Sequence, residues 1–497
     1  MIYIYDYKIT NNDGVVAYGM EDDHNKCLYF RNILSLTYQI PESMSKESLQ
    51  NYLKLIRTTK LNSSWDGCTK RIYRADKRQI EFVFDSLRIY NRVLKVILKL
   101  NLLSNQDPLL QFLYSNNLQT LTWYRYTTEE HFIKTIELVE STLIPPLRLA
   151  SFDIECTRFT EDGKFPNFNN LHDQIIQIGI TYSEWSNDTC YYRQIITLDT
   201  CDPVDGVEVI TCCSEEDVIL CWAGQLHKHQ INLITGYNIN SFDFTYIYER
   251  AKLLEIDTEL LNRISWTKQP AIFDPYHHNY FVYKNHQINI PGVVNIDLLY
   301  CFRTNKTLPK LKNNKLKTVA QHYTTQSKGD VSPDEIFALQ KKTSADRKII
   351  AEYCVQDCAL CNLLWICSGM YKYYLTMTTL YKVPFRYLFH HRYYEQMITH
   401  PLRIYFEKKR IDKTILDEPG FKLFKSSLTN NPIILKLYIK ALEKQLRKIK
   451  VHFNVPYRDI KLAKSMGAKW DHESKEWFAD KEDVRLKLSK QWKMILR

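Results

Sequence analysis

The 497-residue sequence has few glycines and no long apolar run. Its 13 glycines are never adjacent. No stretch approaches the roughly 20 apolar residues of a membrane-spanning helix, so we expect no membrane contact. The N-terminus lacks a basic region followed by an apolar core, which excludes a secretory signal peptide. No internal repeat and no low-complexity tract is found.

The 13 cysteines follow no spacing that is typical of a disulfide framework. Cys354, Cys358 and Cys361 fall on one predicted helix, and a zinc site is the alternative there. No second ligand pair follows at a zinc-like distance, so packed thiols are favoured. We therefore expect an intracellular protein in a reducing compartment, not a secreted one.

Positive charge is concentrated in the last fifth of the chain. Residues 1–400 contain 43 basic and 44 acidic side chains, whereas residues 401–497 contain 24 and 12. A localised basic region indicates a polyanionic partner, and nucleic acid is the first candidate. A solvated lysine-rich helix is the alternative for this region taken alone.

The pattern of apolar runs and turns predicts an α/β protein, α+β overall, in four parts. Residues 1–146 form a mixed domain with a β component, with strands at Met1–Tyr7, Lys26–Phe30 and Ile80–Phe84 and a helix at Ser86–Leu102. Residues 147–375 alternate strands and helices. Residues 376–450 are an aromatic and basic junction with a helix at 433–450, and residues 451–497 form a small basic module.

Within 147–375, strands are predicted at Leu149–Cys156, Gln174–Tyr182, Tyr191–Leu198 and Ile231–Tyr237. Helices are expected from Ser214 to about His229, over Phe242–Leu254, and from Ser344, as the capping residue, to near Gly369. This pattern predicts a sheet flanked by helices, with acidic residues at the ends of strands and helices.

Four carboxylates in three short segments point to a metal site. Asp153 and Glu155 alternate on one strand and so share a face. Asp243 opens a helix, and Asp357 lies one turn after Tyr353 on the long helix. Clustered acids repel each other unless a cation neutralises them, and oxygen ligands favour Mg²⁺ or Mn²⁺. Two such ions are suited to in-line displacement at a phosphodiester.

The segments resemble the three exonuclease motifs of family B DNA polymerases. The first motif is similar to Ser151-Phe-Asp-Ile-Glu155, with Asp173-Gln-Ile-Ile-Gln-Ile178 downstream. The second is similar to Asn238-x-x-x-Phe-Asp243, and the third to Tyr353-x-x-x-Asp357. The stretch around Val383-Pro-Phe385 also resembles the segment after this domain in the family. The resemblance covers about residues 1–410, closely from 147 to 360, and is nearest to members from large DNA viruses.

The resemblance implies an RNase H-like 3′→5′ exonuclease domain that removes misincorporated nucleotides during DNA replication. Two Mg²⁺ or Mn²⁺ ions would be bound by Asp153, Glu155, Asp243 and Asp357. The same resemblance implies that Tyr353 orients the attacking water.

The resemblance also implies contacts with single-stranded DNA. Asn238 and Phe242 would contact the 3′-terminal nucleotides, and an aromatic ring can stack on any base. The candidates to follow the strand are Lys310, Lys312 and Lys315, with a solvated loop as the alternative.

The sequence departs from the family after the exonuclease motifs. The palm motifs Asp-x-x-Ser-Leu-Tyr-Pro-Ser and Tyr-Gly-Asp-Thr-Asp are absent, and 97 residues follow position 400. We therefore expect no polymerase activity from this chain alone, and a separate palm-containing chain as a possible partner. The C-terminal region, with Gly467-Ala-Lys-Trp470 and Trp477-Phe478, resembles a small module attached to primases. Those aromatic residues form either its core or a stacking surface.

Two alternatives to an exonuclease remain open from the sequence. One is a catalytically inactive, DNA-binding accessory subunit of a split viral polymerase, in which the basic tail matters. The other is a nuclease of the same fold that acts on RNA.

Overall fold

The computed structural model describes most of residues 1–389 and parts of the C-terminal region. The described residues are 1–10, 14–31, 34–39, 68–74, 79–84, 108–141, 143–158, 166–256, 264–267, 272–276, 285–305, 308–324, 331–389, 451–453, 455–456, 459–471, 476–479 and 494–495. The helices predicted at Ser86–Leu102 and 433–450 lie outside them. The chain divides into two compact units, Met1–Glu418 and Pro419–Arg497. The four-part division expected from the sequence stays a prediction.

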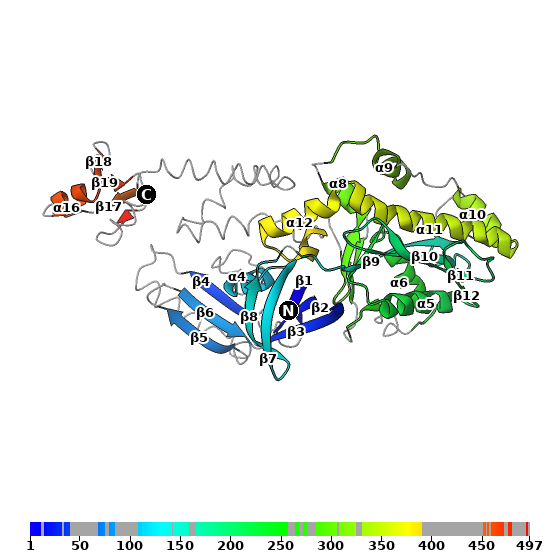
Figure 1. Ribbon diagram of the computed structural model, residues 1–497, viewed down its shortest axis with the longest axis horizontal. Coiled ribbons are helices and arrows are strands. Elements are labelled where there is room, and N and C mark those ends of the chain that lie inside the picture. The colour runs from blue at the N-terminus through cyan, green and yellow to red at the C-terminus, as the bar shows by residue number, and fades with distance from the viewer. Residues whose placement is uncertain are drawn as a thin grey trace. The chain divides into compact units, whose positions relative to one another are not determined.

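The N-terminal region is built around a closed five-stranded barrel (Figure 1). Its strands, in hydrogen-bonded order, are β1 (Ile2–Thr10), β2 (Gly14–Glu21), β3 (His24–Arg31), β8 (Phe132–Val139) and β7 (Thr122–Glu129). Several tyrosines on these strands are fully buried, among them Tyr5, Tyr7 and Tyr18. A helix, α4 (Pro108–Ser115), and a separate sheet of β4 (Leu34–Gln39), β5 (Cys68–Arg74) and β6 (Gln79–Phe84) complete the described part of this region.

Buried polar contacts join the barrel to the segments that follow it in the chain. Arg386 donates two hydrogen bonds to the Asp6 carboxylate, one of them from Nε at 2.7 Å. The Tyr5 hydroxyl donates to the Gly292 carbonyl at 2.8 Å and accepts from the Asn232 amide at 3.2 Å. Because unpaired buried polar groups are costly, these contacts fix the barrel against the central sheet.

The central sheet has six strands in the order β12-β11-β10-β9-β13-β16. Their bounds are β9 (Arg148–Cys156), β10 (Ile175–Glu184), β11 (Cys190–Leu198), β12 (Glu208–Cys212), β13 (Leu233–Gly236) and β16 (Val294–Asp297). Strand β9 lies at the centre, antiparallel to β10 and parallel to β13. Because both faces of this strand are covered, most of β9 is buried, and Arg148, Asp153 and Glu155 are its partly buried residues.

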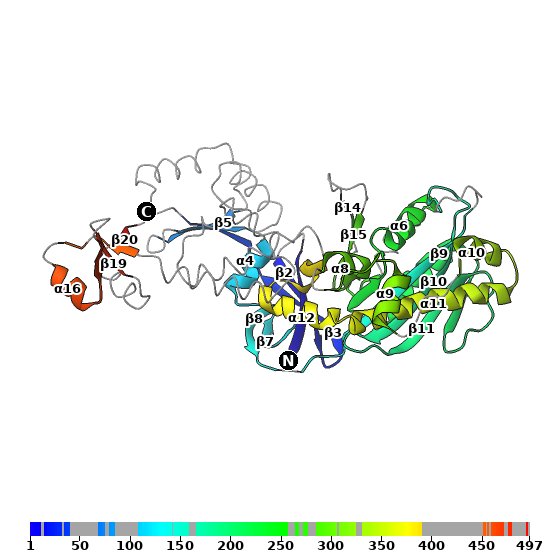
Figure 2. The ribbon, with the colours of Figure 1, turned by 90° about the horizontal axis from the view of Figure 1, so that it is seen from above.

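Helices cover both faces of this sheet (Figure 1), and the view from above shows α11 lying across it (Figure 2). Helices α5 (Glu215–Lys228) and α6 (Asp243–Leu253) pack on one face, where Phe152 contacts Trp222 and Phe244. The long helix α11 (Ser344–Cys367) packs across β9 and β10 on the opposite face. The remaining elements of this unit are β14 (Ile272–Tyr276), β15 (Asn285–Asn289), α8 (Leu298–Thr304), α9 (Leu316–Tyr323), α10 (Pro333–Gln340), α12 (Met370–Tyr381) and the 3₁₀ helix η3 (Phe385–Phe389).

The α/β fold expected from the sequence is confirmed, with differences in detail. Helix α11 is capped by Thr343, whose side chain accepts from the Asp346 backbone, so Ser344 is the first helical residue and not the cap. Strands β12 (Glu208–Cys212) and β16 (Val294–Asp297) were not predicted.

The sequence led us to expect no segment as long and apolar as a membrane-spanning helix, but helix α11 is such a segment. It is long and apolar enough to cross a membrane by composition, and 61% of its most apolar window is buried inside the protein. Its apolar character is explained by its packing on the sheet. The described cysteines are all free thiols, and Cys354, Cys358 and Cys361 are buried on this helix.

The described part of the C-terminal unit consists of a small antiparallel sheet and one short helix. Strands β18 (Lys469–Asp471), β19 (Glu476–Ala479), β17 (Val451–Phe453) and β20 (Met494–Ile495) are hydrogen bonded in that order. Helix α16 (Ile460–Ser465) supplies Ala463 to a buried cluster with Ala468 and Trp477.

Candidate active site

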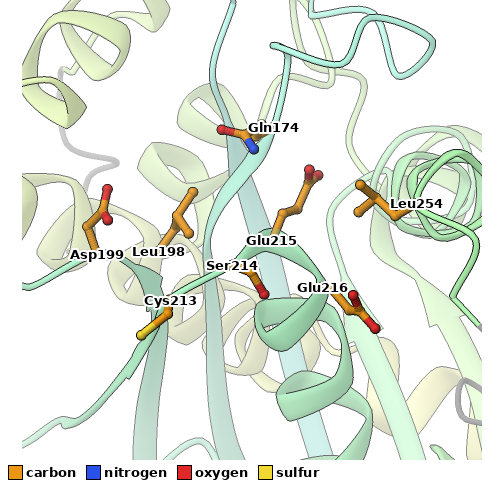
Figure 3. A pocket seen from close by; sticks show the side chains of 8 residues that line it. All are labelled: Gln174, Leu198, Asp199, Cys213, Ser214, Glu215, Glu216 and Leu254. Atoms are coloured by element: carbon orange, nitrogen blue, oxygen red, sulfur yellow. The ribbon is translucent and has the colours of Figure 1, made fainter.

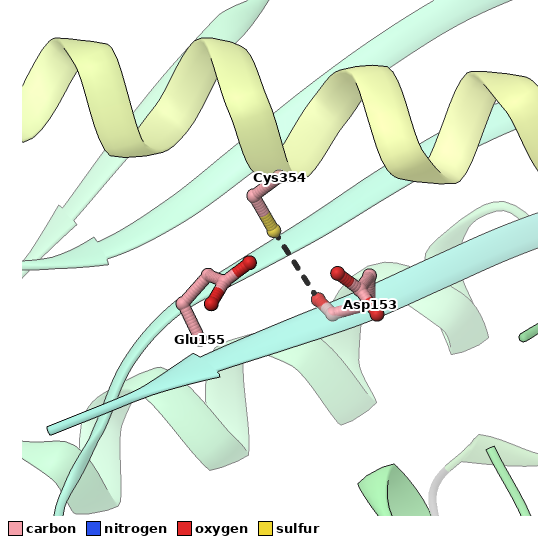
Figure 4. A group of neighbouring side chains, drawn as sticks. All are labelled: Asp153, Glu155 and Cys354. Carbon is pink, nitrogen blue, oxygen red and sulfur yellow. Dashed lines mark hydrogen bonds between the residues drawn. The ribbon is translucent and has the colours of Figure 1, made fainter. Parts of the chain in front are cut away.

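The two faces of β9 carry different chemistry. Phe152 and Ile154 point into the apolar core, whereas Asp153 and Glu155 point toward α11, as strand alternation requires (Figure 4). Carboxylate oxygens of both acids and the Cys354 sulfur lie within 4.8 Å of one another. Both acids are only partly buried, so they remain accessible from solvent.

Cys354 takes part in this group as a hydrogen-bond donor. Its thiol donates to the Asp153 backbone carbonyl at 3.5 Å (Figure 4). Hydrogen bonding with Cys358 lowers the pKa of the Cys354 thiol, but burial and the charges of Asp153 and Glu155 raise it overall to about 12. Mg²⁺ and Mn²⁺ prefer oxygen ligands, so Asp153 and Glu155 are the donors of this group that suit these ions.

Asp243 approaches the same strand from α6. Its Oδ1 accepts from the backbone N–H of Ile154, between the two acids, at 3.0 Å. Pairing of β13 with β9 ends at Ser151, which leaves that N–H for a side-chain acceptor. Burial and the charge of Asp153 raise the pKa of Asp243 well above its usual value. Such repulsion between buried acids is what a bound divalent cation would relieve.

Asp357 and Tyr353 are both buried on α11, one helical turn apart. The pKa of the neighbouring Cys361 thiol is raised by burial and then by the charges of Asp153 and Asp357. The charge of Asp243 also raises the pKa of the Cys361 thiol. Three of the carboxylates are therefore near enough to Cys361 to raise the pKa of its thiol. Among the described residues, only Asp153 and Glu155 lie within 4.8 Å of each other and of a third possible ligand, the Cys354 sulfur.

Asp297 positions the second motif, and sequence reasoning gave it no role. Its carboxylate accepts from the backbone N–H of Asn238 at 3.0 Å and of Asn240 at 3.1 Å. It also caps α8 by accepting from Leu299 and Tyr300. The only sequence signal was an acid at the end of a short apolar run, which is also typical of an ordinary helix cap.

The loop from 237 to 242 is drawn tightly against β9. A Cβ atom at Gly236 would lie 2.6 Å from the Phe152 carbonyl oxygen, so only glycine fits there. Asn238 has a positive φ of 70° and is half-buried, as is Phe242, whose ring contacts Tyr246. Contacts of these two residues with a nucleotide stay a prediction.

The predicted lysines are exposed on the segment that leads into α9. Lys310, Lys312 and Lys315 all face solvent. The Tyr237 hydroxyl donates to the Asn314 carbonyl at 2.6 Å, which ties this segment to the residue before Asn238. The lysines thus lie on a segment anchored beside the second motif, and their contact with DNA stays a prediction.

A buried ion pair behind the site holds α5, α6 and β10 together. Arg250 donates from Nε to Glu215 at 2.8 Å, and the same carboxylate oxygen accepts from the Ile175 backbone. Arg250 also donates to the carbonyls of Asn170 and Phe168.

A hollow of about 440 Å³ opens next to Glu215 (Figure 3). It contains none of the predicted site residues, and it is lined by Gln174, Leu198, Asp199, Cys213, Ser214, Glu215, Glu216 and Leu254.

Comparison with known proteins defines the class to which this fold and site belong. Residues 103–319 match the family model of the DNA polymerase family B exonuclease domain. The chain therefore contains a family B DNA polymerase exonuclease domain, as the resemblance of the three motifs implied. Residues 450–493 match a second model, a domain of unknown function named DUF5710.

Individual relatives are DNA polymerases from viruses and eukaryotes. The chain is 31% identical over 281 residues to a DNA polymerase of Pyramimonas orientalis virus, in a match that covers 44% of this chain and 23% of that protein. It is 32% identical over 279 residues to the DNA polymerase catalytic subunit of human herpesvirus 8, covering 52% and 27%. The chain thus spans about a quarter of the length of these relatives.

A solved structure has the same fold. The family B DNA polymerase of the archaeon Pyrobaculum calidifontis superposes with a TM-score of 0.58 at 14% identity. The match covers 82% of this chain and 50% of that chain. At this identity the similarity concerns the fold alone.

Proposed function

We propose that this chain is a 3′→5′ DNA exonuclease that hydrolyses terminal phosphodiester bonds with two divalent ions. The observation that supports the proposal is the hydrogen bond from the Ile154 backbone N–H to Asp243, which brings a third carboxylate next to the strand segment that carries Asp153 and Glu155. Asp357, on the helix that covers this face, completes the set of four acids.

The residues present fit two Mg²⁺ or Mn²⁺ ions. Asp153, Glu155, Asp243 and Asp357 would hold them, because hard divalent ions take carboxylate oxygens. When bound, the ions lower the pKa of the attacking water and stabilise the leaving 3′ oxygen. Burial, and then the charge of Asp153, raise the pKa of Asp243, and a bound cation would favour its charged form, which supports this assignment.

The protein's own groups would bind and orient the end of the strand. Tyr353, one turn from Asp357, would orient the attacking water through its hydroxyl. Phe242 would stack against a terminal base through the exposed part of its half-buried ring. The lysines before α9 would attract the phosphate backbone.

Nucleotidyl transfer is outside this proposal. The 497 residues contain none of the palm motifs of family B polymerases. Where DNA synthesis accompanies proofreading, the palm would come from a polypeptide outside these residues, and a separate palm-containing chain is the partner we propose.

The direct test is release of nucleotides from a 5′-labelled primer with a mismatched 3′ end. The intact protein with Mg²⁺ is expected to shorten the primer from its 3′ end, and chelation of the metal to stop the reaction. An Asp153→Asn, Glu155→Gln double variant should lose at least about 100-fold, because even outer-shell partners of metal ligands contribute about 10- to 100-fold. Glu184→Gln, an exposed acid at the end of β10, is the matched control.

Three outcomes of this assay would contradict the proposal or part of it. No release by the intact protein, where a control nuclease is active, would contradict the proposal and favour a non-catalytic DNA-binding subunit. Undiminished activity of the double variant would contradict the site. Faster cleavage of an RNA strand of the same sequence would favour the RNA-directed alternative.

A further inference from the structure

The C-terminal unit has one buried and one exposed tryptophan, side by side. Trp477 is 6% exposed and belongs to the buried cluster with Ala463 and Ala468. Trp470 is 41% exposed. A large aromatic side chain on the surface of so small a unit is unusual, since burying it would add to a minimal core. Trp477 is therefore core, and Trp470 is free to contact a ligand.

Strand register places the two rings on the same face of the sheet. Trp470 and Trp477 are direct partners on the antiparallel strands β18 and β19. Their ring centroids are 5.3 Å apart, with an edge-to-face angle of 62°. Cross-strand partners point to the same side of the sheet, so the Trp470 ring packs against the Trp477 ring. Trp470 nevertheless stays 41% exposed.

Helix α16 brings positive charge to this face. The Lys464 ammonium lies 5.6 Å from the centroid of the Trp477 ring. Lys464 and Trp470 therefore contact the same buried ring. Lys461, one turn earlier on α16, is also exposed. We call Lys461, Lys464 and Trp470 the Trp470 face.

The charge of the whole unit agrees with that of the Trp470 face. Residues 419–497 contain 19 basic and 8 acidic side chains. An exposed aromatic ring beside lysines, on a basic unit, is the combination by which proteins hold unpaired bases and their phosphates together. The excess of positive charge favours a polyanion over a protein partner. In duplex DNA the bases are already stacked on each other, so no base is free to stack on a single ring.

We propose that the Trp470 face binds single-stranded DNA, with Trp470 stacked on a base and Lys464 paired with a phosphate. The choice of DNA rests on the DNA polymerase exonuclease domain in the same chain. Binding at this face needs no 3′ end, in contrast to the exonuclease site. The C-terminal unit would thus retain an internal stretch of the strand whose end is being processed.

The test uses the full chain and circular single-stranded DNA, without divalent ions. A circle has no end for the exonuclease site, so a failure of the proposed exonuclease function leaves this measurement intact. Trp470→Ala is expected to weaken binding roughly 5- to 100-fold, the range for loss of one stacked base, while Trp470→Phe retains most of it. Tyr191→Ala, an exposed aromatic residue on β11, is the matched control.

Lys464→Gln tests the phosphate contact through the salt dependence of binding. This quantity would not change if Lys464 had only a structural role. Lys464→Gln should lower the slope of log K against log salt by about 0.7, the value for one phosphate contact on a single strand. Trp470→Ala should leave that slope unchanged. Wild-type affinity of Trp470→Ala, an equal loss in Tyr191→Ala, or an unchanged slope in Lys464→Gln would each overturn the proposal. So would a preference for circular RNA of the same sequence.

Discussion

The central sheet and the C-terminal unit hold their candidate functional residues by different means. In the central sheet, Asp243 is fixed by a backbone bond to β9, and Asp297 fixes the adjacent loop through two more. In the C-terminal unit, Trp470 rests on a core of three fully or largely buried side chains. A two-metal site depends on positions set to fractions of an ångström, whereas stacking on a base tolerates much looser placement. The candidate metal ligands are thus held by more buried contacts than Trp470 is, in line with the greater precision that a two-metal site requires.

Removal of the ion pair behind the site is expected to have the largest effect on the stability of the sheet. Arg250→Met leaves Glu215 charged and buried without its partner, which typically costs about 3–5 kcal/mol. The free energy of unfolding, from urea denaturation, provides the measurement. Lys252→Met is the control, because its pair with Glu249 is at the surface and contributes about 0–1 kcal/mol. Equal effects of the two variants would show that the buried pair is not a support of the site.

The same comparison can be made within the C-terminal unit. Trp477→Ala should cost about 3–5 kcal/mol, as for other buried aromatic residues, and unfold much of this unit. Trp470→Ala should cost less, about 0.5–1.5 kcal/mol for its aromatic pair with Trp477, because Trp470 is 41% exposed. Hydrogen exchange of the backbone amides of β18 and β19 reports both values. A comparable loss of protection in Trp470→Ala would mean that Trp470 belongs to the core.

A smaller effect is expected where α11 meets the sheet. A Cβ at Gly179 would lie 2.9 Å from the Cys354 sulfur and 3.0 Å from that of Cys358. Gly179→Ala should therefore destabilise the protein by about 1–3 kcal/mol, the usual cost of overpacking. Gly224→Ala is the matched control on α5, where nothing lies within 4 Å of the new atom, and should be neutral or stabilising. Thermal denaturation of both variants tests this contrast, which a stable Gly179→Ala protein would contradict.

The smallest effect concerns the lysines before α9. Lys312→Gln should lower the salt slope for binding of linear single-stranded DNA by about 0.7, with only a modest loss of affinity. Lys134→Gln, an exposed lysine on the N-terminal barrel, should leave the slope unchanged. If Lys312→Gln also leaves it unchanged, the segment is a solvated loop, which was the alternative interpretation of its sequence.

The sequence was sufficient to predict the elements that carry the four acids. Strands β9 and β10 and helices α5, α6 and α11 lie within about two residues of their predicted bounds, since local periodicity and capping decide them. The roles of Asp297 and Arg250 could not be predicted in this way. Both depend on partners at least 35 residues away in the chain. Which tryptophan of the C-terminal unit is buried was equally undecided, because register, not composition, determines it.

Gly179 has one more consequence. In strand register it is the direct partner of Asp153, and the Cys354 and Cys358 sulfurs occupy the space that its side chain would fill. The depth at which α11 lies on the sheet, and with it the gap between Asp357 and the acids of β9, is therefore set jointly by positions 179, 354 and 358. A larger residue at one of these positions is tolerable only if another becomes smaller. We therefore expect these three sites to vary together among related sequences, so that the spacing of the acids is inherited as a unit.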